Sequence, residues 1–368
     1  MSTALINAGI FTGTEKLTGK AILIENSTIK AIIDPAFIPE KSEVIDCRGN
    51  YVSAGLIDLQ IAGSGGYLLS AKPSVEALTG MTESIVKSGT TGFLIVVPTN
   101  TFETYRKVVR IIKENPNPSV LGLHLEGPYI SPVRRGAHLE ELIRKPEIKE
   151  IQELFAEAGG VIKMVTVAPE VCDDRFIRFL TDNGIVVAAG HSNATYDEAF
   201  TGFNSGIKTV THLYNAMTPM HHRDPGLPGA VFESPDICAS IIADGIHVHY
   251  GAVSIAKKIM KERLFLVSDA VEENIDGIYP DHIRQKDRFT LPDGTLSGSL
   301  LTMMKAVKNC VENIQIPVEE ALRMASFYPA RLMGISDRGM IAPGEKADLV
   351  VFDKDFDIKQ VFVEGKRV

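Results

Sequence analysis

Two acidic residues and two histidines of this chain stand at the ends of apolar, β-rich runs. Glu126, His191, His212 and Asp269 each close or directly follow a different run. Two imidazoles and a carboxylate are a common ligand set for a catalytic metal ion, and this set leaves a coordination position for water. Each residue taken alone has a structural alternative, a hydrogen-bonded histidine or a capping carboxylate. Their joint placement predicts a metal site formed by Glu126, His191 and His212.

Asp269 is the acid that remains for proton transfer, because Glu126 is assigned to the metal. A metal ion lowers the pKa of its bound water towards neutrality and polarises a carbonyl oxygen. A carboxylate beside that water can accept its proton and later pass it to a leaving amine. Asp58 and Asp244 are weaker candidates; Asp58 lies within an apolar run, as a buried structural acid would. Zn²⁺ is the first choice of metal, while Fe²⁺, Co²⁺ and Mn²⁺ also accept mixed nitrogen and oxygen ligands.

These residues need a scaffold that brings the ends of separate strands together. Over the middle of the chain, apolar β-rich runs alternate with segments of helical periodicity that often open with Ser, Thr or Asp caps. This alternation is typical of a parallel sheet buried on both faces. Eight runs predict a closed (β/α)8 barrel of the TIM type, whose chemistry sits at the C-terminal strand ends; an open sheet is the alternative. The strands are expected at Ala54–Ile61, Thr91–Val97, Val120–Glu126, Ile162–Ala168, Ile185–His191, Thr209–Leu213, Ile237–Ala243 and Leu264–Asp269.

Both ends of the chain differ from this middle part. They hold short β-rich runs broken by Gly, Asn and Asp, too few at either end for a sheet of their own. Paired with each other, these runs predict a small β-sandwich domain from residues 1–53 and 335–368, with the barrel formed by residues 54–334.

The barrel helices are expected at Ser74–Lys87, Phe102–Glu114, Ile148–Glu157, Asp173–Thr181, Asp197–Gly202 and Ala252–Lys261.

Composition narrows the class of protein. A net charge of -8 has the same sign as nucleic acid and anionic membranes, so neither is an expected partner. No apolar stretch approaches the ~18 residues of a membrane span, and the first residues lack the pattern of a signal peptide. The four cysteines form no CxxC pair, which argues against a thiolate metal site and a disulfide framework. We therefore expect a cytoplasmic enzyme that acts on a small molecule.

Two loops carry residues suited to substrate binding. The loop Tyr129–His138 is rich in Gly, Pro and positive charge, and His138 could donate a hydrogen bond to a substrate carbonyl. Arg223 has the planar fork that matches a phosphate or a carboxylate, although it could equally pair with Asp224. The adjacent His221 and His222 precede Arg223, but neighbouring side chains usually point apart, so they are left out of the metal site.

Taken together, these segments resemble the N-acetylglucosamine-6-phosphate deacetylases of the amidohydrolase superfamily. The likeness extends over nearly the whole chain, including the split β domain. The matching stretches are Gly55-Leu-Ile-Asp-Leu-Gln, His124-Leu-Glu-Gly-Pro-Tyr-Ile, Gly136-Ala-His, Gly190-His-Ser-Asn-Ala, Thr211-His-Leu-Tyr-Asn-Ala-Met, Arg223-Asp-Pro-Gly, Ala243-Asp-Gly-Ile-His, Val267-Ser-Asp-Ala and Gly298-Ser-Leu-Leu-Thr-Met.

The resemblance implies a role for each matching residue. Glu126, His191 and His212 would bind the metal, Asp269 would be the general acid and base, and His138 would polarise the acetyl carbonyl. It also implies that Arg223 reaches the substrate from a neighbouring subunit, and hence a homodimer. The substrate-binding residues would be Ala137, His138, Asn215, Ala216, Arg223 and His247, with Leu301, Thr302 and Met303 as a further lining stretch.

One departure from the superfamily bears on the number of metal ions. Many amidohydrolases carry His-x-His at the end of the first strand, which supports a second metal. Here that position reads Gln60-Ile-Ala62, and an alanine cannot ligate a metal. The sequence therefore resembles the branch with one divalent ion per subunit.

The expected reaction is hydrolysis of N-acetylglucosamine 6-phosphate to glucosamine 6-phosphate and acetate. Another amide hydrolase on the same scaffold is an alternative, acting on N-acetylgalactosamine 6-phosphate or an N-acyl-amino acid. A barrel that has lost catalysis and only binds a ligand is the remaining one. Such a protein should lack one of Glu126, His191, His212 or Asp269, and this chain has all four.

Overall fold

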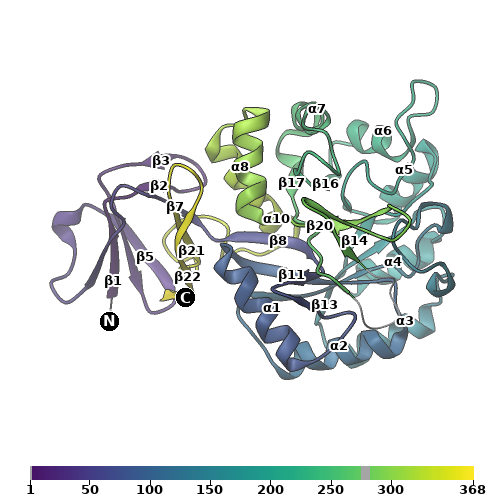
Figure 1. Ribbon diagram of the computed structural model, residues 1–368, viewed down its shortest axis with the longest axis horizontal. Helices are drawn as coiled ribbons and strands as arrows, with labels where there is room; N and C mark the ends of the chain where they lie inside the picture. Colours follow the sequence, from purple (N-terminus) through teal and green to yellow (C-terminus); the bar gives the residue numbers. More distant parts are fainter. Residues whose placement is uncertain (1, 275–281) are drawn as a thin grey trace. The chain divides into compact units, whose positions relative to one another are not determined.

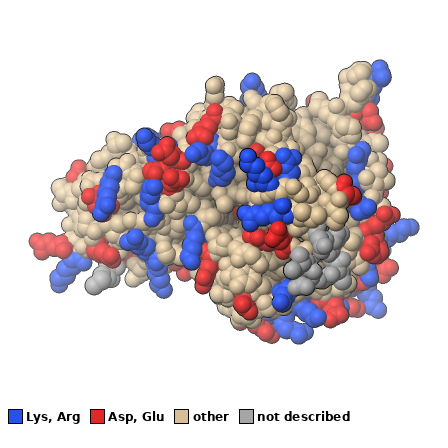
Figure 2. Space-filling model, in the orientation of Figure 1, with Lys and Arg blue, Asp and Glu red and all other residues tan. Residues whose placement is uncertain are grey.

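The computed structural model describes residues 2–274 and 282–368, and these divide into two compact units. Of the described residues, the barrel unit comprises 59–83, 93–274 and 282–301, and the terminal unit comprises 2–58, 84–92 and 302–368. Basic and acidic side chains are interspersed over the face shown in Figure 2. Within the described residues, no helix has both the length and the apolar character needed to cross a bilayer.

The barrel is a sheet of eight strands (Figure 1). Around this sheet the strands follow one another in the same order as along the chain. Its two ends meet at an isolated parallel bridge between Ile61 and Ala270. Backbone hydrogen bonds of 2.9 Å, from Asp269 N to Gln60 O and from Ala62 N to Ala270 O, complete this closure. The predicted barrel is confirmed, and the open sheet is excluded. The strands are β8 (Leu56–Ile61), β11 (Thr90–Pro98), β12 (Val120–Glu126), β13 (Ile162–Val167), β14 (Val186–Ala189), β15 (Thr209–Val210), β16 (Cys238–Ile241) and β17 (Leu264–Leu266).

Several helices between these strands begin at Thr or Asp caps, the kind of cap that the sequence predicts. Thr101 accepts from Thr104 N, Asp173 accepts from Phe176 N, and Thr195 forms a capping box with Glu198. The predicted helices are present with ends shifted by about a turn or less. They are α1 (Val75–Lys87), α2 (Phe102–Glu114), α3 (Ile148–Ala158), α4 (Asp174–Asp182), α5 (Tyr196–Ser205) and α7 (Tyr250–Met260).

Helix α6 (Gly226–Glu233) is an element that the sequence pattern did not reveal. Its sequence Gly-Leu-Pro-Gly disfavours a helix, because glycine and proline have the poorest helix propensities. Residues 226–231 are all buried, so packing outweighs propensity. At Gly226 the backbone has φ +58°, and a Cβ there would lie 2.4 Å from Thr218 Oγ1.

A three-stranded antiparallel sheet follows the last barrel strand and was also not predicted. It consists of β18 (Ile283–Arg284), β19 (Arg288–Thr290) and β20 (Leu296–Ser299). Phe289 of this sheet is fully buried against Leu68 and Val271, with Ala62 packed against the same cluster. The hairpin of β9 (Gly63–Ser64) and β10 (Tyr67–Leu68) supplies Leu68. Ala62, at the position that the resemblance compares with the second histidine of His-x-His, thus packs against this apolar cluster.

The terminal unit contains two sheets built from both ends of the chain. Strand β7 from the N-terminal part pairs antiparallel with β21 from the C-terminal part, with Val52 opposite Val351 (Figure 1). Ile10, Ile22 and Phe362 join these two valines in one core, which confirms the predicted β-sandwich. The exact domain limits stay a prediction. One sheet has the order β5 (Thr28–Ile33), β4 (Ala21–Glu25), β1 (Ser2–Ile6), β6 (Glu43–Asp46), and the other β23 (Lys366–Arg367), β22 (Ile358–Val363), β21 (Leu349–Phe352), β7 (Tyr51–Ala54), β2 (Gly9–Phe11), β3 (Lys16–Leu17).

Three helices of the terminal unit follow the barrel unit in the chain. They are α8 (Met303–Ile314), α9 (Val318–Ala325) and α10 (Phe327–Leu332). Thr302 caps the first of them by accepting from Lys305 N. The stretch Leu301–Met303 therefore leads into a helix.

Candidate active site

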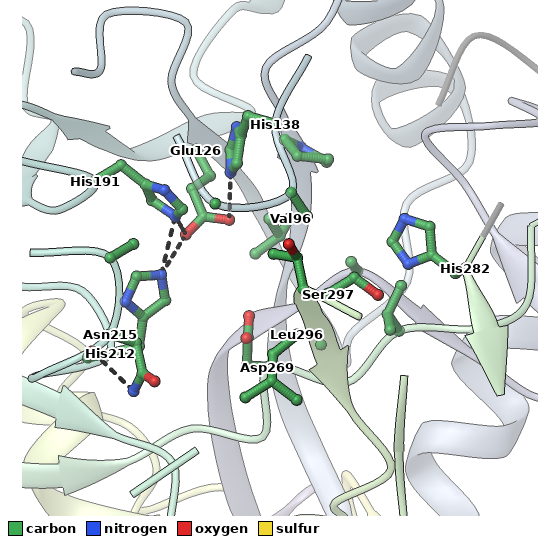
Figure 3. A pocket seen from close by; sticks show the side chains of 18 of the residues that line it. Val96, Glu126, His138, His191, His212, Asn215, Asp269, His282, Leu296 and Ser297 are labelled. Atoms are coloured by element: carbon green, nitrogen blue, oxygen red, sulfur yellow. Dashed lines mark hydrogen bonds and ion pairs between the residues drawn. The ribbon is translucent and has the colours of Figure 1, made fainter. Parts of the chain in front are cut away.

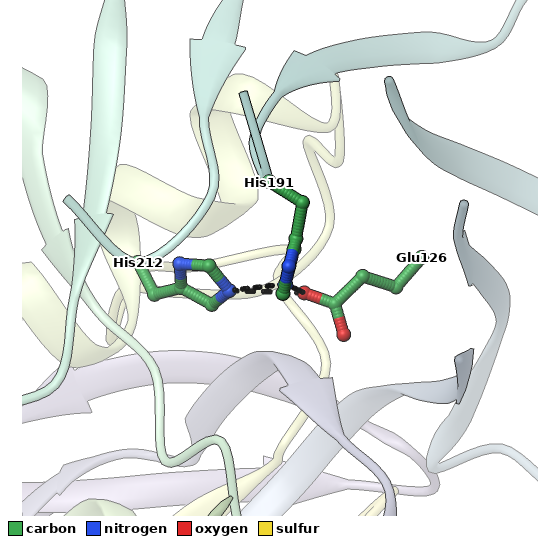
Figure 4. A group of neighbouring side chains, drawn as sticks. All are labelled: Glu126, His191 and His212. Atoms are coloured by element: carbon green, nitrogen blue, oxygen red, sulfur yellow. Dashed lines mark hydrogen bonds and ion pairs between the residues drawn. The ribbon is translucent and has the colours of Figure 1, made fainter. Parts of the chain in front are cut away.

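The three predicted metal ligands lie together at the C-terminal ends of their strands. Glu126 is the last residue of β12, and His191 and His212 each follow a strand, β14 and β15, by two residues. His212 Nε2 lies 3.1 Å from Glu126 Oε1 and 3.1 Å from His191 Nε2, and His191 Nε2 lies 3.3 Å from the same carboxylate oxygen (Figure 4). All three residues are buried. Separate strands thus bring three ligand atoms to one point.

Unusual backbone conformations aim these side chains. His191, His212 and Asp269 have φ angles of 45°, 33° and 52°, in the left-handed region that residues other than glycine rarely adopt. Each turn comes directly after a barrel strand. Strained residues of this kind persist only where the surrounding structure over-determines them, and they cluster at functional sites.

The donor atoms fit a divalent cation. A carbonyl oxygen only accepts, so His191 Nδ1 must donate in its 3.0 Å contact with Arg134 O, which leaves a lone pair on Nε2 of the neutral ring. Three ligand atoms bound at about 2.0–2.1 Å in tetrahedral geometry lie roughly 3.3–3.4 Å apart. The observed separations of 3.1 to 3.3 Å are close to that spacing. Glu126, His191 and His212 could therefore hold one metal ion with mixed nitrogen and oxygen ligation.

Asp269 lies beside the ligand set and is connected to it through Gln60. Gln60 Nε2 donates to Glu126 Oε1 at 2.9 Å and to Asp269 Oδ1 at 3.0 Å. Desolvation is the main influence on Asp269, opposed by His212 and reinforced by Glu126, and it raises the pKa of its carboxyl group to about 6. This carboxyl group can both accept and return a proton near neutral pH.

The role of Gln60 was missed in the sequence, where it counted only as a departure from His-x-His. The signal was its place at the end of the first barrel strand. A side chain that points inward there meets the residues that follow the other strands. An amide with two N–H groups at this place holds two carboxylates that would otherwise repel each other.

His138 presents an N–H group to the same cavity. Its Nδ1 accepts from Thr99 N at 3.2 Å, so the proton of the neutral ring is on Nε2. Burial, the largest influence, lowers the pKa of His138 to about 3, so the ring stays neutral at physiological pH. Its Nε2 lies 3.8 Å from Glu126 Oε2 (Figure 3). An N–H group in this place can donate to a carbonyl oxygen of a bound substrate.

A buried hydrogen-bond chain lies among the strands beneath these groups. His124 Nδ1 donates to Leu59 O at 3.1 Å, and its Nε2 is 2.7 Å from Thr166 Oγ1, which is 2.7 Å from Thr211 Oγ1. Burial lowers the pKa of His124 to about 4, so this ring is neutral as well. The residues next in sequence to Leu59 and Thr211 are Gln60 and His212, so the chain braces the residues that support the site.

The cavity in front of the ligands has a volume of about 420 Å³ and lies within the barrel unit. Of the predicted substrate-binding residues it is lined by Ala137, His138, Asn215, Ala216 and His247. His282, Leu296 and Ser297 also line it and were not predicted, because no sequence pattern marks the short strands β18 to β20 (Figure 3).

The remaining predicted residues do not line this cavity within the described chain. Leu301 and Met303 are buried, while Thr302 and Arg223 are exposed. Their roles stay predictions. Asp58 is buried, and Asp244 faces His247 and its own turn.

A closed barrel with a buried Glu–His–His set and an aspartate at one mouth has the groups that a metal-dependent hydrolase requires. The sequence signature of the amidohydrolase family matches residues 51–368, and the NagA composite domain matches residues 3–52. The chain belongs to the amidohydrolase family.

Relatives named as deacetylases match most or all of the chain. It is 38% identical to the N-acetylglucosamine-6-phosphate deacetylase of Haemophilus influenzae, over 100% of this chain and 99% of that protein. The crystal structure of N-acetylglucosamine-6-phosphate deacetylase from Pasteurella multocida superposes with a TM-score of 0.96 at 36% identity, covering 100% of both chains. An N-acetylgalactosamine-6-phosphate deacetylase of Escherichia coli O157:H7 is 34% identical over 74% of this chain and 75% of that protein.

Proposed function

We propose that this chain hydrolyses the acetamide of N-acetylglucosamine 6-phosphate, giving glucosamine 6-phosphate and acetate. The observation that carries the proposal is the convergence on one cavity of a metal-ligand set, the carboxyl group of Asp269 and the Nε2–H of His138. The names of the relatives point to the same substrate.

A metal ion held by Glu126, His191 and His212 would supply Lewis-acid chemistry, activating water and polarising a carbonyl oxygen. We take the metal to be one Zn²⁺ per subunit; Fe²⁺, Co²⁺ and Mn²⁺ suit the same ligands. We propose a single ion, and two observations support this: Gln60 donates to two carboxylates, and Ala62 packs against an apolar cluster.

The protein groups then divide the proton transfers between them. Asp269 accepts the proton of the attacking water and later delivers it to the amide nitrogen, so that the carbon–nitrogen bond breaks and the amine leaves neutral. His138 donates its Nε2–H to the carbonyl oxygen on which negative charge develops. Gln60 keeps the carboxyl group of Asp269 in place during both transfers.

The sugar phosphate would be held away from the metal ligands. Asn215, Ala216 and His247 line the cavity and would bind it. Arg223 is exposed, in keeping with a role across the interface of a homodimer, where it would bind the phosphate of the neighbouring subunit's substrate. We also propose a cytoplasmic location, in line with a phosphorylated metabolite and with cysteines that are all free thiols.

The test is acetate release from a panel of substrates with metal-stripped and metal-restored protein. N-acetylglucosamine 6-phosphate should be turned over only with metal, and its unphosphorylated form should lose most of the activity. N-acetylgalactosamine 6-phosphate and an N-acetyl-amino acid complete the panel. A higher kcat/KM for either of these would replace the proposed substrate, and activity in the stripped protein would refute the metal mechanism.

A further inference from the structure

Glu170 is an acidic residue near the mouth of the barrel that the proposed proton transfers do not use. It follows strand β13 by three residues, and β13 lies between β12, which ends at Glu126, and β14, which precedes His191. Among the described residues, those that line the cavity do not include Glu170. Both of its carboxylate oxygens instead accept hydrogen bonds from the protein. Its role must therefore come through the residues that it holds.

Glu170 binds the two residues that follow His191. Its Oε2 accepts the hydroxyl group of Ser192 at 2.7 Å, and its Oε1 accepts the backbone N–H of Asn193 at 2.6 Å. Hydrogen bonds to a carboxylate are shorter and stronger than those between neutral groups. Ser192 is fully buried, and its Oγ also accepts the backbone N–H of Ala194 at 3.0 Å. One carboxylate thus supports the main chain over three consecutive residues.

The supported turn is the one that aims His191. The φ angle of His191 is 45°, and a residue in this region stays there only where the surrounding structure over-determines its conformation. Backbone hydrogen bonds hold the turn on both sides, from Ser131 N to His191 O at 2.9 Å and from Ser192 N to Ala216 O at 3.0 Å. Glu170 adds the side-chain support. A turn that relaxed would move the imidazole away from the other two ligand atoms, which lie 3.1 and 3.3 Å from it.

A second path leads from the same turn to the imidazole ring. Asn193 Oδ1 accepts from Arg134 Nε at 3.0 Å, and Arg134 O accepts from His191 Nδ1 at 3.0 Å. The residue whose backbone N–H Glu170 holds therefore also helps to place the carbonyl group that orients the ring. Groups that hydrogen-bond a metal-binding imidazole fix its orientation and its affinity for the metal. Both the backbone and the ring of His191 are thus connected to Glu170.

We propose that Glu170 is a positioning residue that keeps His191 in its metal-binding geometry through Ser192 and Asn193. The inference rests on the proposed function, since it takes His191 as a metal ligand. It assigns control over metal affinity to a carboxylate that lies outside the ligand set.

Glu170→Ala removes both hydrogen bonds and leaves every proposed ligand in place. We expect Kd for Zn²⁺, measured on the folded variant by competition with a chelator, to rise about 10–100-fold, the usual effect of losing a group that orients a metal-binding histidine. An unchanged Kd would overturn the proposal. A loss of stability with an unchanged Kd would overturn it too, because Glu170 would then only support the fold.

The matched control is Glu198→Ala, in the same stretch after β14. Glu198 Oε2 accepts the backbone N–H of Thr195 at 2.8 Å and its hydroxyl group at 2.9 Å, the same two kinds of donor that Glu170 binds. This variant should lose stability through its broken capping box, while Kd for Zn²⁺ stays within about twofold. Equal rises of Kd in the two variants would overturn the proposal, because they would indicate a general loosening of the loop.

Two further variants complete the test. If Glu170→Ala does not fold, Glu170→Asp takes its place, because a carboxylate that is one methylene shorter cannot reach both donors. Its Kd should rise at least about threefold, and an unchanged Kd would overturn the proposal. His191→Ala separates this inference from the proposed function. If His191→Ala leaves Kd unchanged, the proposed metal site and the role of Glu170 fail together. If His191→Ala releases the metal while Kd of the Glu170 variant equals that of wild-type protein, only the role of Glu170 is overturned.

Discussion

Replacing Gln60 by methionine tests how the two carboxylates in the cavity are kept together. Methionine has a similar length but no N–H group, so Gln60→Met removes both the 2.9 Å bond to Glu126 and the 3.0 Å bond to Asp269. A hydrogen bond to a charged group contributes about 1.5–3 kcal/mol, and the lower figure applies here because Asp269 is half-buried. Metal-free protein should therefore lose about 3 kcal/mol of unfolding free energy.

Metal-loaded protein should lose only half as much. A cation at Glu126 is a new partner for that carboxylate, so the bond to Asp269 is the main loss, about 1.5 kcal/mol. The assay is urea denaturation of the variant and of wild-type protein, each with a chelator and with excess zinc. The reduced loss in zinc is the signature of the bridge between the carboxylates.

The control for this experiment is Gln360→Met in strand β22. The carbonyl oxygen of Gln360 is buried without a partner among the described residues, so the same chemical change should cost little in either state. An equal loss for Gln60→Met with and without zinc would show that Gln60 only fills space. A loss below about 1 kcal/mol in metal-free protein would show that the two bonds contribute little to stability.

Three further predictions concern the proton transfers and the metal. Asp269→Asn should still bind metal and substrate while kcat falls by about 10²–10⁴-fold, and near-normal turnover would mean that another group moves the proton. Because the pKa of Asp269 is raised to about 6, the base is lost as pH falls through that value, so kcat/KM should drop about tenfold per unit below it. A bound cation shifts this limb downwards, so a midpoint clearly above pH 6 would contradict the assignment. His191→Ala should release metal from purified protein, which elemental analysis measures, and a full complement of metal in the variant would remove His191 from the ligand set.

The barrel could be predicted because the spacing of apolar residues along the sequence matches the way its strands and helices are buried in the fold. Strands such as β12 are buried on both faces and read as continuous apolar runs, and helix α5 opens with the capping pair Thr195 and Glu198. The ligand set could be predicted for a related reason. Polar residues such as His191 stand at the ends of otherwise apolar runs, so the sequence distinguishes them from the residues around them.

The elements and residues that were not predicted do not differ from their sequence neighbours in this way. Helix α6 contains Pro228 and two glycines, and its stability comes from burial that a single sequence does not report. Strands β18 and β19 are only two and three residues long, too short for a period. Gln60 could have been found by asking which polar side chain ends the first barrel strand. The contacts of Ser297 could not, because they depend on how this short sheet packs.

The left-handed backbone at His191, His212 and Asp269 sets selection for activity against selection for heat resistance. Each such residue costs about 1–3 kcal/mol, which glycine would largely avoid. A population evolved only to survive heating should therefore accumulate substitutions in and around these turns that relax the backbone to an ordinary φ, and activity should fall as they appear. A population that must also grow on the substrate would have to find its stabilising substitutions elsewhere. The conformation of three residues thus predicts where a trade-off between stability and activity will appear in the sequence.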